Sequence, residues 1–170
     1  MKVHPITLPL FVYGTLKKGG KYDAVLTEFA CENTKAFTFG TLYHVPYIDE
    51  ENNPCITVAL DPVGVQRVSG ELLTFDDCAA NNALAVSDDK EFNFSDLSTR
   101  EKKDRVFIRT IITCYSPVGE AFLAWAYIYV SRTHKPSVLV NVDSSFGAFV
   151  EYRAIGYREY ATRLQSLKNG

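Results

Sequence analysis

The sequence predicts a mixed α/β domain of the α+β type, with a curled sheet or small barrel at its centre. Predicted strands dominate the middle of the chain, and the predicted helices are short and peripheral. Strands and helices do not alternate regularly, which argues against a doubly wound parallel sheet. A chain of 170 residues, 46% of them hydrophobic, fits a single packed domain spanning residues 1–170.

The first elements are a strand, a turn, a helix and a second strand. Residues 8–13 form an apolar run that ends at Gly14, which predicts a buried strand entering a turn. Residues 14–20 have the glycine and lysine content of a loop. Apolar residues at helical spacing predict a short helix over 22–29. The period then changes to two, which predicts a strand over 36–43.

The middle of the chain predicts two further strands and a polar segment. An acidic loop over 49–54 precedes strands at 56–60 and 67–75, and Gly70 marks a bulge or a close approach. Residues 77–95 are polar and alanine-rich, so we expect a surface excursion with one weak helix, inserted into the domain.

The last predicted elements are a hairpin and a helix. Convincing strands at 106–114 and 122–130 are joined by Ser-Pro-Val-Gly at 116–119, a turn composition. Helical spacing of apolar residues predicts a closing amphipathic helix over about 148–168.

Composition excludes several classes of function. The net charge is −2 and no basic stripe is present, so nucleic-acid or anionic-membrane binding is not expected as a primary role. No apolar run approaches the roughly 20 residues that cross a bilayer, and no secretory signal is recognised. The four cysteines are scattered without a Cys-x-x-Cys pair, which is typical of reduced thiols. We therefore predict a cytoplasmic protein.

The segment from Leu10 to Gly19 is the most informative part of the sequence. A strand that breaks at a glycine beside a hydroxyl residue exposes backbone N–H groups that can hold a carboxylate, a phosphate or an oxyanion. By composition alone, an ordinary strand-to-loop turn is the favoured explanation of the segment. Gly14 and Gly19 have the spacing of a phosphate loop, but Gly20-Lys21-Tyr22 follows where Lys and then Ser or Thr are required. The phosphate-loop interpretation is therefore rejected.

Metal and serine chemistry have no support in the sequence. The three histidines, His4, His44 and His134, show no metal-ligand spacing with one another or with the cysteines. No Gly-x-Ser-x-Gly motif is present. We expect neither a metal nor a cofactor.

The segment Val12-Tyr13-Gly14-Thr15-Leu16-Lys-Lys-Gly resembles the opening motif of the γ-glutamylcyclotransferase-like (AIG2-like) family, in the branch that contains γ-glutamylamine cyclotransferases. Three later matches follow in the same order. Val68–Leu72 is similar to the family's Val-x-Gly-Glu-Leu/Val strand, and Ala124–Tyr129 to its Ala-x-Val-Tyr-x-Tyr strand. Between them, Leu97–Glu101 and then Phe107–Arg109 resemble Leu-Asp-x-x-Glu followed by Tyr-x-Arg. The resemblance covers residues 10–130 and implies a small closed barrel of mixed strands with short flanking helices.

The resemblance also implies a site. The family's general acid/base glutamate falls on Glu101, and Tyr127 falls where it lines the pocket. The loop that holds the γ-glutamyl substrate falls on Tyr13, Gly14, Thr15 and Leu16. Ser98 replaces the usual Asp, Phe107 replaces the usual Tyr, and the 77–95 insertion precedes the catalytic segment, so substrate identity is the part in doubt.

The chemistry that this resemblance implies suits these residue types. The α-amine of a γ-glutamyl compound attacks its own γ-carbonyl and releases an amine and 5-oxoproline, so the enzyme holds the chain curled. One base takes the proton from the ammonium and returns it to the leaving nitrogen. A glutamate does both when partial burial raises its pKa from about 4.3 toward neutrality.

Alternatives remain open at this point. Glu101 lies in a charged run, 100–105, which by residue type alone is typical of solvated surface. Glu71 is the runner-up carboxylate, although a strand glutamate is more often paired or outward-facing. The cavity could instead hold a small anionic metabolite without catalysis, or the same chemistry could remove a γ-glutamyl group from a larger acceptor. The leaving amine, the oligomeric state and the pathway are not set by the sequence.

Overall fold

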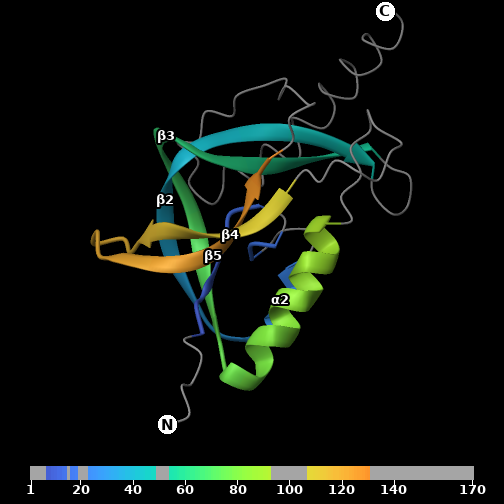
Figure 1. The fold of residues 1–170 in the computed structure, drawn as a ribbon, viewed down its shortest axis with the longest axis vertical. Helices are drawn as coiled ribbons and strands as arrows, with labels where there is room; N and C mark the ends of the chain where they lie inside the picture. Colours follow the sequence, from blue (N-terminus) through green and yellow to red (C-terminus); the bar gives the residue numbers. More distant parts are fainter. Residues whose placement is uncertain (1–6, 15, 19–22, 49–53, 93–106, 131–170) are drawn as a thin grey trace, which may run out of the picture.

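The computed structural model describes residues 7–14, 16–18, 23–48, 54–92 and 107–130 (Figure 1). Thr15, Glu101 and the predicted helix over 148–168 lie outside these ranges. Within them, no helix is both long and apolar enough to cross a membrane. The elements in chain order are β1 (Leu10–Val12), α1 (Asp23–Thr27), β2 (Ala30–Ile48), β3 (Pro54–Phe75), α2 (Asp77–Phe92), β4 (Phe107–Tyr115) and β5 (Ala121–Tyr129).

The strands form a closed barrel in the order β1-β3-β2-β4-β5, with an additional pairing between β3 and β5. The β1–β3, β2–β3, β2–β4 and β4–β5 pairs are antiparallel, whereas β1–β5 and β3–β5 are parallel. The predicted small closed barrel of mixed strands is confirmed, and α2 runs along one side of it (Figure 1).

The longest ladder joins β2 and β3, and it corrects one prediction. The strands expected at 56–60 and 67–75 are parts of the single strand β3. Gly40 pairs with Gln66 while Thr41 pairs with Asp61, so residues 62–65 bulge from the ladder. Pro62 and Gly64 interrupt the apolar pattern in this bulge, although the backbone keeps its pairing on both sides.

Two hydrophobic clusters lie on the two faces of the barrel wall. On β1, Leu10 and Val12 belong to the outer cluster, under α2, while Phe11 belongs to the inner cluster. This alternation is the period of two that a strand buried on both faces requires. β1 therefore forms the partition between the barrel interior and the helix.

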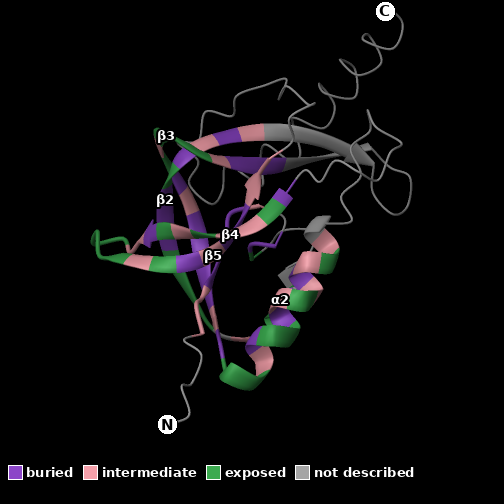
Figure 2. Cartoon of the chain, in the orientation of Figure 1, coloured by how far each residue is buried: buried purple, intermediate pink, exposed green. Residues whose placement is uncertain are grey.

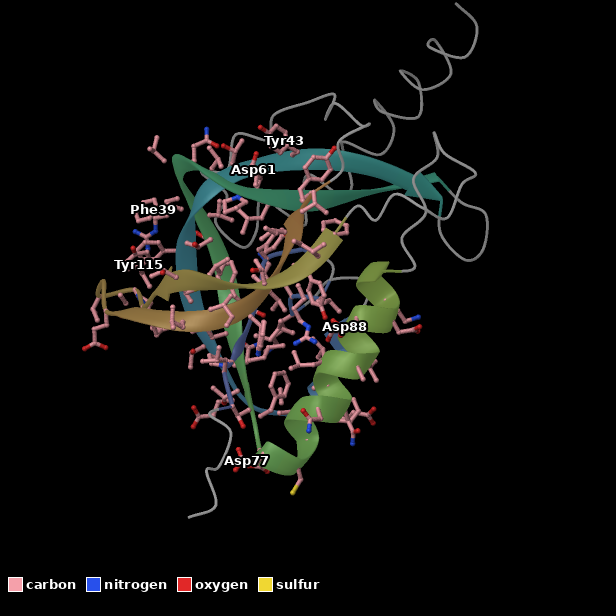
Figure 3. The ribbon with its side chains drawn as sticks, viewed as in Figure 1. Phe39, Tyr43, Asp61, Asp77, Asp88 and Tyr115 are labelled. Atoms are coloured by element: carbon pink, nitrogen blue, oxygen red, sulfur yellow. The ribbon has the colours of Figure 1, made fainter. Side chains whose placement is uncertain are left out.

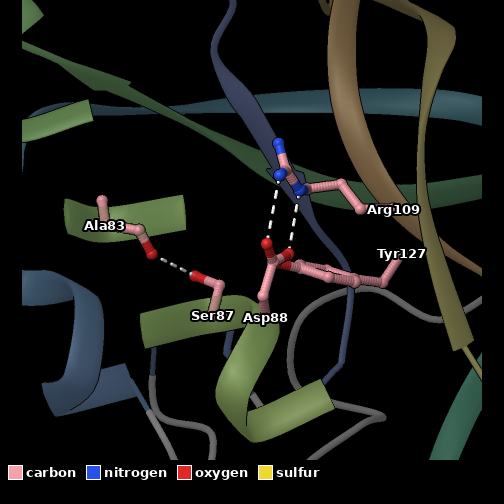
Figure 4. A network of polar contacts seen from close by, with 5 residues as sticks. All are labelled: Ala83, Ser87, Asp88, Arg109 and Tyr127. Atoms are coloured by element: carbon pink, nitrogen blue, oxygen red, sulfur yellow. Dashed lines mark hydrogen bonds and ion pairs between the residues drawn. The ribbon is translucent and has the colours of Figure 1, made fainter. Parts of the chain in front are cut away.

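Helix α2 confirms the helix predicted within 77–95, but it packs on the barrel, where we expected a surface excursion. Ala80, Ala83 and Ser87 are buried against the barrel at helical spacing, and the Ser87 hydroxyl donates to the Ala83 carbonyl at 2.7 Å (Figures 2 and 4). These small side chains let the helix lie close to the sheet. The expectation failed because alanine and serine give little apolar signal, even where they are fully covered. That the segment is an insertion stays a prediction.

Two glycine predictions are confirmed by the backbone. A Cβ at Gly70 would lie 2.5 Å from Phe11 Cζ and 2.6 Å from the Val12 carbonyl oxygen, so this is a point of close approach. In the β4–β5 hairpin, the Gly119 N–H donates to the Ser116 carbonyl at 2.9 Å, and Gly119 has a φ of 91°, which favours glycine.

Cys78 and Cys114 are free thiols in contrasting environments. Cys78 is exposed on α2, whereas Cys114 is buried in the inner cluster. Burial disfavours the thiolate and raises the pKa of Cys114 to about 12.

We expect iodoacetamide to label Cys78 and to spare Cys114 in the folded protein. At about pH 8 only about one Cys114 thiol in ten thousand would be ionised, and the thiolate is the reactive form. Peptide mass spectrometry reads the two sites separately, and labelling in guanidinium chloride is the control in which both should react. Alkylation of native Cys114 as fast as Cys78 would contradict this account.

Candidate functional site

The turn after β1 has the closed geometry that the sequence indicated. The Lys17 N–H donates to the Gly14 carbonyl at 3.0 Å and closes a turn that begins at Gly14. Tyr13, just before the turn, is buried in the inner cluster, and Leu16, within it, is buried in the outer one. The turn is therefore held from both faces of the barrel wall.

The Tyr13 hydroxyl makes two hydrogen bonds inside the barrel. It accepts the Leu60 N–H of β3 at 2.9 Å and donates to the Tyr127 carbonyl of β5 at 2.6 Å. A tyrosine hydroxyl has a single proton, and here that proton goes to β5. Tyr13 can therefore offer a ligand its ring and its backbone, while its hydroxyl supports the fold.

A buried carboxylate lies beside the turn. Glu71 of β3 is 6% exposed, and its Oε2 accepts the Lys18 N–H at 2.9 Å and the Asn33 side-chain amide at 3.0 Å. Lys17 is also buried; desolvation lowers the pKa of its ammonium, and the negative charge of Glu71 partly opposes that effect. Glu71, which the sequence left as the alternative carboxylate, is thus buried and paired.

A polar network joins α2 to the β4–β5 hairpin (Figure 4). Arg109 makes a bidentate ion pair with Asp88, with Nε–Oδ1 at 2.8 Å and a second bond to Oδ2 at 3.1 Å. The Tyr127 hydroxyl donates to Asp88 Oδ1 at 2.7 Å, and the Arg109 guanidinium lies 4.7 Å from the centre of the Trp125 ring. Figure 3 shows Asp88 on the barrel side of α2, whereas Phe39 and Tyr115 are in ring contact elsewhere on the barrel surface.

The predicted site residues that the structure describes are partly brought together. Tyr127 connects the turn to α2, because its carbonyl binds Tyr13 and its hydroxyl binds Asp88. Gly14 and Leu16 lie in the turn itself. Thr15 and Glu101 lie outside the described residues, so their roles stay predictions.

Sequence reasoning missed Asp88 as the partner of Arg109. A usable signal was present, because Asp88-Asp89-Lys90-Glu91 has the Asp-x-x-Glu spacing of the family pattern. This segment has the aspartate of the pattern, whereas the segment at 97–101 has Ser98 in its place. Glu91 lies in the last turn of α2, three residues after Asp88. The segment at 97–101 has the leucine and the glutamate of the pattern, and the segment at 88–91 has its aspartate and its glutamate.

Two open clefts adjoin these groups. One of about 740 Å³ is lined by Leu16 and Lys18 of the turn, together with residues of α1 and β2 and Leu73 of β3. The other, of about 470 Å³, runs along α2 beside Asp88 and Arg109. Among the side chains that the structure describes, no three of His, Cys, Asp or Glu gather as metal ligands.

Comparison with known proteins decides the family. The family model described as gamma-glutamyl cyclotransferase, AIG2-like, matches residues 10–144. This chain belongs to that family. The match includes the Tyr13–Leu16 turn, α2 and the β4–β5 hairpin. All five strands of the barrel therefore lie within the matched residues of this cyclotransferase family.

Several solved structures are similar to this chain at low sequence identity, two of them with TM-scores above 0.5. YkqA from Bacillus subtilis is 20% identical, with 88% of this chain and 42% of that chain covered and a TM-score of 0.51. The allophanate hydrolase of Kluyveromyces lactis is 14% identical, with 89% of this chain and 22% of that chain covered and a TM-score of 0.54. An aig2-like protein from Mus musculus is 21% identical, with 81% and 87% covered and a TM-score of 0.45.

This chain therefore spans less than half the length of YkqA and about a fifth of the hydrolase. Both likenesses concern the fold of the barrel. No curated protein matches the chain closely enough to count as a relative.

We expect the Asp88–Arg109 pair to stabilise the fold measurably. Asp88→Ala and Arg109→Ala should each lower the free energy of unfolding by about 1.5–3 kcal/mol, because each leaves a half-buried charge without its bidentate partner. A double-mutant cycle in urea should give a coupling of about 1–2 kcal/mol. Asn82→Ala, on the exposed side of α2, is the matched control. Additive single effects would show that the pair does not hold the helix.

Proposed function

We propose that this protein is a γ-glutamylcyclotransferase-type enzyme that acts on a γ-glutamyl amine, amide or γ-glutamyl-lysine dipeptide. The observation that carries the proposal is the Gly14 turn, held between the two hydrophobic clusters in a chain of the cyclotransferase family. Such a turn supports a reaction whose main requirement is a curled substrate held still.

In the proposed reaction the α-amine attacks the γ-carbonyl, a ring C–N bond forms, and the bond to the leaving nitrogen breaks. The α-ammonium loses two protons as it becomes the ring N–H of 5-oxoproline: the base passes one to the leaving nitrogen, and the other ends on the released amine, as its ammonium, or in solvent. The Lys17 and Lys18 N–H groups already bind Gly14 and Glu71. We therefore assign the substrate, as oxyanion or as α-carboxylate, to the N–H groups of Gly14, Thr15 and Leu16.

Two glutamates compete for the acid/base role. Glu101 is the residue that the resemblance implied, and Glu91 is the alternative in the last turn of α2. Glu91 is supported by Asp88, which Arg109 and Tyr127 hold three residues earlier on the same helix. Glu71 is less suited to shuttle a proton, because its Oε2 already accepts two hydrogen bonds from the protein.

The test is turnover of a panel of γ-glutamyl compounds, with 5-oxoproline and free amine read by mass spectrometry. The wild-type protein is expected to release both products. Glu101→Gln should keep the fold and lower kcat by about 10²–10⁴-fold, because a glutamine cannot exchange the proton. Circular dichroism verifies the fold of each variant.

Glu91→Gln is the matched variant in the same assay. If Glu91→Gln loses turnover and Glu101→Gln does not, Glu91 is the acid/base and the reaction stays as proposed. Normal release of 5-oxoproline by both variants would contradict a glutamate at either position as the acid/base.

A non-catalytic binder of a small anion is the second candidate. It is favoured by Phe107, which is 2% exposed in the outer cluster and lacks the hydroxyl of the family's usual tyrosine. The panel separates the candidates, because a binder would retain its ligand unchanged and a cyclotransferase would convert it.

A further inference from the structure

We infer that Glu71 is a positioning residue for the substrate-binding turn, which its buried carboxylate anchors to the sheet through the Lys18 N–H. The inference rests on the proposed function, because it assigns Glu71 to the turn that holds the substrate. It also separates Glu71 from the proton-transfer step.

The hydrogen bonds place Glu71 at the junction of three segments. Glu71 lies on β3 directly opposite Val12, the last residue of β1. Its Oε2 binds Lys18 after the turn and Asn33 on β2. One oxygen atom therefore ties the exit of the turn to β3 and, through Asn33, to β2.

The two ends of the turn are held in different ways. The Lys17–Gly14 hydrogen bond closes the turn on itself, and it would persist if the whole turn moved. The Lys18–Glu71 bond joins the exit of the closed turn to the sheet. A displacement of about 1 Å at a binding group can cost about a hundredfold in rate, so this anchor bears directly on the site.

A carboxylate is an expensive choice at this position. Its neighbours on β3, Gly70, Leu72 and Leu73, are buried, and a charge taken out of water must be compensated by hydrogen bonds and an opposite charge. Compensation comes from the two N–H donors and from the ammonium of buried Lys17. An apolar side chain would pack here without that cost but could not hold the turn.

Two substitutions separate anchoring from charge. Glu71→Gln keeps a carbonyl oxygen at the same reach and removes the charge, whereas Glu71→Asp keeps the charge and withdraws the oxygen by one methylene. If Glu71 anchors the turn, the Lys18 amide should exchange with solvent about 10–100-fold faster in Glu71→Asp and within about tenfold of wild type in Glu71→Gln. Amide exchange by NMR measures this without any substrate.

Kinetics with the γ-glutamyl panel give the second measurement. Glu71→Asp should raise KM about tenfold or more with a smaller change in kcat, and Glu71→Gln should retain most of the wild-type activity. The pH profile of kcat should keep its shape in both variants, because neither alters the proton shuttle. Glu120→Gln, exposed in the β4–β5 hairpin, is the control.

Three results would overturn the inference. Glu71→Gln could lose about a thousandfold in kcat with Lys18 still protected, which would make Glu71 the shuttle. Glu71→Asp could leave Lys18 exchange unchanged, which would show that no anchor exists. Lys18 protection could collapse in Asn33→Ala, which would assign the anchor to Asn33.

The inference about Glu71 can still be tested if a variant does not fold or if the wild-type protein shows no turnover. If the aspartate variant does not fold, Glu71→Gln still tests whether Glu71 is the proton shuttle, and Asn33→Ala still tests which residue holds the Lys18 amide. Absence of turnover in the wild type would refute the proposed function, while amide exchange would still decide whether Glu71 anchors the turn.

Discussion

The hydroxyl of Tyr13 is the interaction on which the site geometry depends. It joins β3 to β5 through Leu60 and Tyr127, where the direct ladder between these strands consists of one parallel pair. Both backbone groups are buried, and a buried N–H or C=O without a partner costs free energy. Since Gly14 follows Tyr13 directly, the same contact that helps to close the barrel also sets where the turn begins that we propose as the substrate site.

From Tyr13 the polar contacts continue through Tyr127 to Asp88 and Arg109. The turn, the hairpin and α2 are thus parts of one network. At the exit of the turn, the Lys18 N–H donates to Glu71. Networks of this kind rigidify a core only when their members are satisfied. A reaction whose nucleophile is already tethered to the substrate gains most from such rigidity, because positioning supplies much of its rate.

The sequence was informative where structure is local and less so where it depends on distant contacts. The β4–β5 hairpin and the close approach at Gly70 were predicted, because turn composition and a strand glycine carry these signals within a few residues. β3 was divided in two at its bulge, since its continuity comes from pairing with β2. The burial of Ala80 and Ser87 depends on the barrel surface beneath α2, which no local pattern encodes. Asp88 and Arg109 are 21 positions apart, so no local pattern predicts their ion pair. The Asp-x-x-Glu spacing at 88–91 was the one sequence signal for Asp88.

The most direct measurement is a titration of the isotopically labelled protein with 5-oxoproline, followed by the backbone amide resonances. The account predicts that saturable shifts concentrate on Gly14, Leu16 and Lys18 and extend to Tyr127, while the hairpin turn at 116–119 stays unchanged. Saturable shifts confined to other parts of the barrel, with the turn unaffected, would contradict a substrate site built on Tyr13 and the residues that follow it.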